Sequence, residues 1–315
     1  MLERQISADR FPLLSGPSAL TGALTSPHPA HVVEAITTGE PYQVKALLTN
    51  SNLLTSLEDS KRVLKALLNL DLLVVFELFM TPTAEFADYV LPVTWFLESD
   101  TITEYMGLNF IAARSRALEP IGEAREEGEV LLEILKSLGM SDRVPFEDYR
   151  GYLDYRLSPL GLDFDHFVEV GYVVNPYIER KYEKGLLRPD GKEGFNTPSG
   201  KVELYSTILE GHGYGPLPVH REPSPGPYAT PDLFKEYPFI LITGTRSLPF
   251  YHGLGLQIDK FRRLHPHPLI EISPDAASAL GLQEGDWVIL EVPDRDEGVK
   301  RKVHIARASR QGGVR

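Results

Sequence analysis

The sequence predicts an α/β protein: a parallel-sheet domain, then an irregular connection, then a small all-β barrel. Three observations predict this fold class. A strand–loop–helix–strand pattern comes early, a stretch rich in Tyr, Pro and Gly follows, and short strands with glycine-rich corners come last. The chain of 315 residues has room for roughly two domains. We expect a lead-in segment over 1–29, the α/β domain over 30–140, the connection over 141–235 and a truncated barrel over 236–315.

Composition excludes several classes of protein. Hydrophobic residues make up 42% and charged residues 24%, which is typical of globular chains. The formal net charge of −12 argues against a nucleic-acid binder, because neutralising phosphates needs clustered Lys and Arg. With no cysteine, the chain itself can supply no disulfide, thiol nucleophile, iron–sulfur ligand or thiolate to a metal. We expect a soluble protein with no signal peptide and no membrane span, and the compartment, cytoplasmic or periplasmic, stays open.

The early strand–helix–strand pattern is typical of a parallel sheet. A short helix is expected over 31–38, and an apolar strand follows over 44–48. Thr55 and Glu58 have the spacing of a capping box for the next helix. The continuous apolar run 72–76 is typical of a strand buried on both faces. These segments form a βαβ unit.

The remaining elements are expected from the same signals. Thr81 caps a short helix over 82–87, and an amphipathic helix ends before Gly139. Val202 and Leu204 alternate as in a strand. The other strands are expected over 89–91, 109–114, 239–243, 269–272, 287–292 and 299–305, with a helix over 274–280.

Polar residues follow the strands of the βαβ unit. Asn50 and Asn52 come at the carboxyl end of the first strand, where open α/β sheets bind ligands. Glu77 ends the next strand, at the offset where a carboxylate accepts ribose hydroxyls in mononucleotide-binding folds. The alternative is that the asparagines only build a turn and that Glu77 is solvated.

Two residues in the barrel region could also meet a ligand. Arg246 follows a predicted strand in a Gly-containing loop, where a guanidinium can clamp a diphosphate. His252 could hydrogen-bond a cofactor. The alternatives are a surface arginine in a turn and a packed histidine.

The other sequence patterns are weaker evidence for a binding or catalytic site. Gly253-Leu-Gly255 lacks the third glycine of a dinucleotide fingerprint, and the glycines of 194–200 are one residue too far apart for a P-loop. His265 and His267 are interpreted as loop residues rather than metal ligands. Glu98 and Glu104 could form a carboxylate pair for acid–base work, or be ordinary loop acids.

Together these segments resemble one family, the molybdopterin oxidoreductases of the dimethyl sulfoxide reductase type. The resemblance covers most of 30–310, in the family's order. It includes Thr49-Asn-Ser-Asn-Leu-Leu54 and Phe195-Asn-Thr-Pro-Ser-Gly-Lys201. The other segments that carry it are 39–46, 70–75, 79–92, 240–246, 268–275 and 280–288.

The resemblance implies a Rossmann-like α/β domain and a double-psi β-barrel. It implies bis-molybdopterin guanine dinucleotide with molybdenum or tungsten, used for two-electron redox or oxygen-atom transfer. Asn52 and Ser56 would contact a guanosine moiety, Glu77 its ribose, and Glu127 the guanine N1–H and N2–H groups. The second dinucleotide would meet Thr243, Gly244, Arg246, Ser247 and His252.

Two departures from the family pattern shape the hypothesis. Leu53 stands where the family commonly has proline. The segments with the metal ligand and any iron–sulfur cluster normally precede everything seen here. The chain therefore looks like the C-terminal portion of an oxidoreductase, and we expect it to be inactive alone. Its expected partners are the missing N-terminal domains, or a separate chain that carries the metal ligand. Electron-transfer subunits are further expected partners. The alternatives are a non-catalytic guanine-nucleotide or cofactor-binding module, a split subunit, or a poorly folding remnant.

Overall fold

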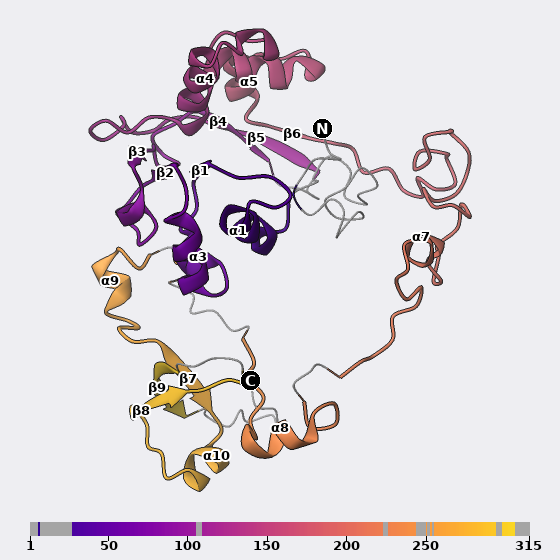
Figure 1. Ribbon diagram of the computed structural model, residues 1–315. Helices are drawn as coiled ribbons and strands as arrows, with labels where there is room; N and C mark the ends of the chain where they lie inside the picture. Colours follow the sequence, from indigo (N-terminus) through magenta and orange to yellow (C-terminus); the bar gives the residue numbers. More distant parts are fainter. Residues whose placement is uncertain are drawn as a thin grey trace. The chain divides into compact units, whose positions relative to one another are not determined.

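The computed structural model describes residues 6, 27–104, 109–222, 226–243, 250, 253, 255–293 and 298–305. The chain divides into two compact units (Figure 1). The first comprises 1–176 with 248–259, and the second comprises 177–247 with 260–315. Within the described residues, no helix has the length and apolar character that crossing a bilayer requires.

A three-stranded parallel sheet confirms the predicted βαβ unit. Its order is β1 (Ala46–Thr49), β2 (Leu72–Glu77) and β3 (Tyr89–Pro92). Thr49 lies opposite Val75, and Glu77 lies opposite Pro92. The helices of this part are α1 (Pro29–Thr38), α2 (Leu53–Ser56), α3 (Ser60–Leu67) and the 3₁₀ helix η3 (Ala84–Phe86).

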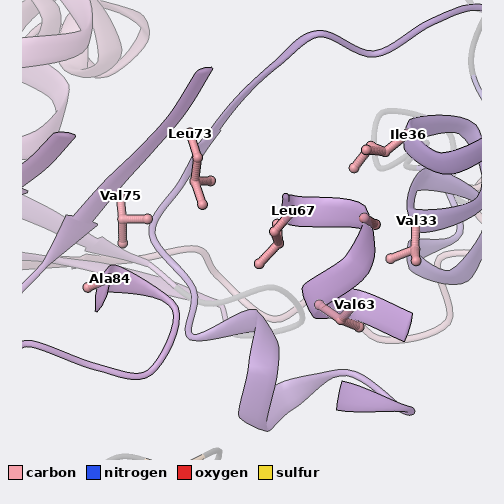
Figure 2. Packing of buried hydrophobic residues seen from close by; sticks show 8 residues of the cluster. Val33, Ile36, Val63, Leu67, Leu73, Val75 and Ala84 are labelled. Atoms are coloured by element: carbon pink, nitrogen blue, oxygen red, sulfur yellow. The ribbon is translucent and has the colours of Figure 1, made fainter. Parts of the chain in front are cut away.

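Apolar side chains of the helices and of β2 form the first core. Val33 and Ile36 of α1 face α3. Four successive residues of β2 are buried, as expected for a central parallel strand, and Leu73 and Val75 among them belong to this core. Figure 2 shows the side chains of α3 between those of α1 and those of Leu73 and Val75. This core holds β1 and β2 in register and so fixes the position of their carboxyl ends.

Two local expectations for this region were wrong. The helix predicted to start at the Thr55–Glu58 capping box is instead divided into α2 and α3. Asp59 caps α3, because its side chain accepts a hydrogen bond from the Arg62 backbone N–H at 3.3 Å. The segment 82–87 forms only the short η3, although Thr81 does accept a hydrogen bond from the Ala84 backbone N–H at 3.4 Å.

A second, antiparallel sheet belongs to the same unit. Its order is β4 (Thr101–Glu104), β5 (Phe110–Arg114) and β6 (Tyr172–Val174). Phe164 and Phe167 are fully buried in its core, together with Leu153 and Leu157. The helices of this part are α4 (Glu127–Ser137), α5 (Tyr149–Leu157) and α6 (Phe164–Val170), with 3₁₀ helices η4 (Ser141–Arg143) and η5 (Ser158–Leu160). The expected connection therefore contains several regular elements, while the domain limits at 140 and 235 stay predictions.

The second unit contains one three-stranded sheet, not the expected closed barrel, among its described residues. The strands are β7 (Leu269–Ile272), β9 (Val299–Ile305) and β8 (Trp287–Leu290), in that order. The segments 202–204 and 239–243, expected as strands, have no strand structure, so they supply no further ladder to close the sheet. The helices here are α7 (Thr207–Gly211), α8 (Pro231–Glu236) and α10 (Pro274–Ala279), and α9 (Asp259–Arg262) belongs to this unit from its second residue on.

Candidate functional site

The candidate site lies at the carboxyl edge of the β1–β2–β3 sheet. Because all three strands are parallel, the residues that end them lie on the same edge. Asn50 directly follows β1, and Glu77 is the last residue of β2. Ligands of open α/β sheets bind at this edge.

The start of α4 is attached to this edge by backbone hydrogen bonds. Val93, just after β3, forms an isolated parallel bridge with Arg125. The Arg125 backbone N–H donates to the Pro92 carbonyl at 3.1 Å, and the Thr94 N–H donates to the Arg125 carbonyl at 3.0 Å. Glu127, the first residue of α4, is thereby held close to the loop after β1.

Asn50 and Glu127 are in direct contact. The Asn50 Nδ2 donates to Glu127 Oε1 at 3.2 Å and to Oε2 at 3.3 Å. Among the described residues, no cation pairs with the Glu127 carboxylate. The nearby Arg125 guanidinium is instead bound by Glu129 and Glu133, whose hydrogen bonds raise the pKa of Arg125.

Glu126 caps α4 from the position before it. Its carboxylate accepts hydrogen bonds from the backbone N–H groups of Gly128 at 2.6 Å and Glu129 at 3.2 Å. Burial raises the pKa of Glu126, while these two hydrogen bonds act in the opposite direction. The first turn of α4 thus carries two acidic side chains, Glu127 and Glu129, and Glu126 just before it caps the helix.

Asn52 lies deeper in the same loop, with one half of its amide bonded and the other half unpaired. Its Oδ1 accepts from the Thr83 hydroxyl at 2.9 Å and from the Thr83 N–H at 3.4 Å. The Thr83 hydroxyl also accepts from the Leu54 N–H at 3.0 Å. The Asn52 Nδ2 is buried and has no hydrogen-bond partner among the residues that the structure describes. A buried donor without an acceptor costs stability, so this group is suited to meet an acceptor of a ligand.

Gly253 leaves space beside this unpaired donor. Its φ of +81° is one that side chains rarely adopt. A Cβ at this position would lie 2.8 Å from the Thr55 hydroxyl oxygen and 3.8 Å from the Asn52 Nδ2. Glycine here therefore lets the backbone pass close to Thr55 and Asn52, where a side chain would collide with the Thr55 hydroxyl.

The other predicted site residues have separate surroundings. The Ser56 hydroxyl donates to the Asn52 carbonyl at 2.5 Å. The Glu77 Oε1 accepts from the Leu78 N–H at 2.9 Å, so part of its carboxylate is used locally. Thr243 belongs to the second unit and is exposed. Gly244, Arg246, Ser247 and His252 lie outside the described residues.

Two residues of the site were missed by the sequence reasoning. Thr83 is completely buried, and only tertiary structure places it against Asn52, 31 positions earlier. Gly253 was considered only as part of an incomplete dinucleotide fingerprint. Neither a lone threonine nor a lone glycine carries a sequence signal for such a contact.

The acids Glu98 and Glu104 do not act as a pair. The Glu104 carboxylate binds the Arg156 guanidinium at 2.6 Å. Glu98 is only 6% exposed, and its Oε2 accepts from the Trp95 N–H at 2.9 Å. His267 packs edge-on against Trp287, with ring centroids 5.0 Å apart. No cluster of three His, Asp or Glu side chains suited to a metal ion occurs in the described ranges.

Comparison with known proteins points to one family. Residues 6–137 match the family model described as molybdopterin oxidoreductase. Acetylene hydratase of Syntrophotalea acetylenica is 35% identical over 84% of this chain and 36% of that protein. The F420-dependent formate dehydrogenase subunit alpha of Methanocaldococcus jannaschii is 30% identical over 85% of this chain and 37% of that protein.

A solved structure supports the same grouping. Acetylene hydratase from Pelobacter acetylenicus superposes with a TM-score of 0.84 and 31% identity, over 99% of this chain and 44% of that chain. The chain thus spans little more than a third of the length of the curated relatives it matches.

Proposed function

This chain belongs to the molybdopterin oxidoreductase family, and we propose that it holds the guanine dinucleotide arms of the family's cofactor. Membership implies a molybdopterin cofactor with molybdenum or tungsten. When bound, that group supplies a metal centre for two-electron redox or oxygen-atom transfer. The role of the described residues is to bind and orient the nucleotide end of one arm at the carboxyl edge of the β1–β2–β3 sheet.

The single observation that supports this proposal most is the unpaired Asn52 Nδ2 beside Gly253. Ribose and phosphate oxygens are the acceptors that such a buried amide lacks. A ligand oxygen that binds here replaces an unsatisfied donor by a hydrogen bond, so the gain is larger than at an exposed amide. The Thr83 hydroxyl keeps Nδ2 aimed at the ligand by holding Oδ1.

Glu127 and Glu77 complete the proposed nucleotide site. The Glu127 carboxylate would accept the N1–H and N2–H groups of guanine. Adenine presents a bare ring nitrogen at the corresponding place, which a carboxylate repels. The free part of the Glu77 carboxylate would accept a ribose hydroxyl. We assign the second dinucleotide arm to Thr243, Gly244, Arg246, Ser247 and His252 on the basis of the family resemblance alone.

Nucleotide binding by the full chain tests the proposal. We expect GDP to bind and ADP to bind at least tenfold more weakly, on the order of one hydrogen bond to a charged group. Asn52→Ala should weaken GDP binding by about tenfold for the same reason. Asn69→Ala is the matched control, since Asn69 is exposed at the end of α3 and its substitution should change nothing. Equal binding of GDP and ADP, or an unaffected Asn52→Ala variant, would contradict the assignment.

The metal chemistry is proposed to need further polypeptide. The chain has no cysteine and covers about a third of its relatives, so we assign the metal ligand to N-terminal domains or to a partner chain. Electron-transfer subunits would be further partners. We expect the purified chain, loaded with cofactor, not to reduce an S-oxide with viologen dye. Turnover in that assay would show that the chain carries a sufficient metal site of its own.

A second activity is favoured by the comparisons. The hydratase relative is 35% identical, and the hydratase structure superposes with a TM-score of 0.84. The complete enzyme could therefore add water to an unsaturated substrate instead of transferring electrons. Incubating the complete, reduced enzyme with acetylene and measuring substrate loss without any electron acceptor distinguishes the two activities.

A further inference from the structure

We propose that Asn50 is a positioning residue for base selection: its amide fixes the Glu127 carboxylate in the orientation that recognises the 2-amino group of guanine. This inference rests on the proposed function, since it assumes that Glu127 meets the base. It assigns Asn50 to Glu127 rather than to the cofactor. The contact joins two elements that are 77 residues apart in the sequence.

The distances suit a positioning role. The Asn50 Nδ2 lies at nearly the same distance, 3.2 and 3.3 Å, from the two carboxylate oxygens. An ionised carboxylate has about four acceptor sites, and one amide NH₂ group can occupy at most two of them. At least two acceptor sites remain, which is the number that the N1–H and N2–H donors of guanine need.

The charged groups around Glu127 are bound elsewhere, so a neutral amide orients its carboxylate. The guanidinium of Arg125, two residues before Glu127, is bound to Glu129 and Glu133 at 2.6 to 2.9 Å. Glu126 is engaged in capping α4. Asn50 can therefore restrict the Glu127 side chain without neutralising it, so the full negative charge stays available to the two guanine donors.

Without Asn50, the Glu127 side chain would have to be ordered by the ligand. Ordering a glutamate side chain costs conformational entropy. An unordered carboxylate can still accept one hydrogen bond from N1–H, but it is less able to accept two at once. Removing Asn50 should therefore weaken mainly the hydrogen bond from the second donor, the 2-amino group of guanine.

The experiment compares GDP with IDP, which lacks only the 2-amino group, by calorimetric titration of the full chain. We expect wild type to prefer GDP by about tenfold, as one charge-assisted hydrogen bond would give. In Asn50→Ala this preference should fall towards one, while IDP binding changes little. Asn69→Ala should keep the wild-type preference.

A second variant tests the same contact through pH. Asn50→Asp places a carboxylate about 3 Å from Glu127, with Glu126 and Glu129 nearby and Arg125 already paired, so we expect the two acids to share a proton. GDP binding should be weak at neutral pH and recover as the pH is lowered, whereas wild type should change little over that range.

The unfolding temperature serves as a control on the fold of Asn50→Ala. It should stay the same as in wild type, since Asn50 is exposed.

The outcomes separate this inference from the proposed function. If wild type binds neither nucleotide, both fail. If wild type binds GDP and Asn50→Ala keeps the full preference over IDP, the positioning role alone fails. If Asn50→Ala binds GDP more tightly than wild type, Asn50 competes with the base for Glu127 and the inference is overturned.

Discussion

Thr83 shows how much of the site depends on one buried hydroxyl. Its side chain accepts from the Leu54 N–H and donates to the Asn52 Oδ1, at 3.0 and 2.9 Å. It therefore fixes both the start of α2 and the orientation of the Asn52 amide. The amide orientation matters because it leaves the Nδ2, not the Oδ1, as the unpaired atom.

Replacing Thr83 by valine should damage stability and binding together. The change preserves shape but leaves the Leu54 N–H and the Asn52 Oδ1 without this partner, which should lower the free energy of unfolding by about 1–3 kcal/mol. Urea unfolding measures this loss, and GDP titration should show weaker binding. Thr103→Val is the control, because Thr103 is exposed on β4. A stable Thr83→Val variant with normal GDP binding would show that the hydroxyl does not orient Asn52.

At the scale of elements, α6 carries a pH-dependent cap. Asp163 accepts from the His166 N–H at 2.9 Å, and the His166 ring lies 2.9 Å from the same carboxylate. This hydrogen bond raises the pKa of His166 and also helps to lower the pKa of Asp163. Asp165 and Glu169 act on the histidine in the same direction, and Arg150 binds Asp165 at 2.6 Å.

The sign of the pH effect follows from the raised histidine pKa. The charged pair stabilises the fold below the pKa of the unfolded histidine, and this contribution is lost as the pH rises through the folded pKa. His166→Gln keeps the backbone cap but removes the charge. We expect its deficit in unfolding temperature to be larger at about pH 5.5 than at about pH 8.5. A deficit independent of pH would show that the ring acts by packing alone.

Local signals explain which elements the sequence predicted correctly. Gly39 and Gly139 end their helices with positive φ, and β2 is the buried run expected of a central strand. The errors arise where distant segments decide the structure. The barrel depended on strand pairings that 239–243 does not make, and Asp59 replaced the predicted capping box. The sequence also placed Asn50 and Glu77 at the carboxyl ends of their strands, as the structure has them. The contacts of Asn50 with Glu127 and of Asn52 with Thr83 appear only in the folded chain.

At the scale of the whole molecule, each compact unit has its own buried residues. Phe167 is completely buried in the first unit, and Val303 is 1% exposed in the second. Substitutions at these two positions therefore report on different cores. Of the proposed nucleotide residues that the structure describes, all except Thr243 belong to the first unit.

Calorimetry of the chain should consequently resolve two unfolding steps that respond to different changes. Phe167→Ala should destabilise one step by about 3–5 kcal/mol, and Val303→Ala the other by about 2 kcal/mol, because each leaves a cavity in a separate core. GDP at about 100 times its dissociation constant should stabilise only the step that Phe167→Ala affects, by about 2.7 kcal/mol. If GDP instead raised both steps equally, the assignment of its binding site to the first unit would be wrong.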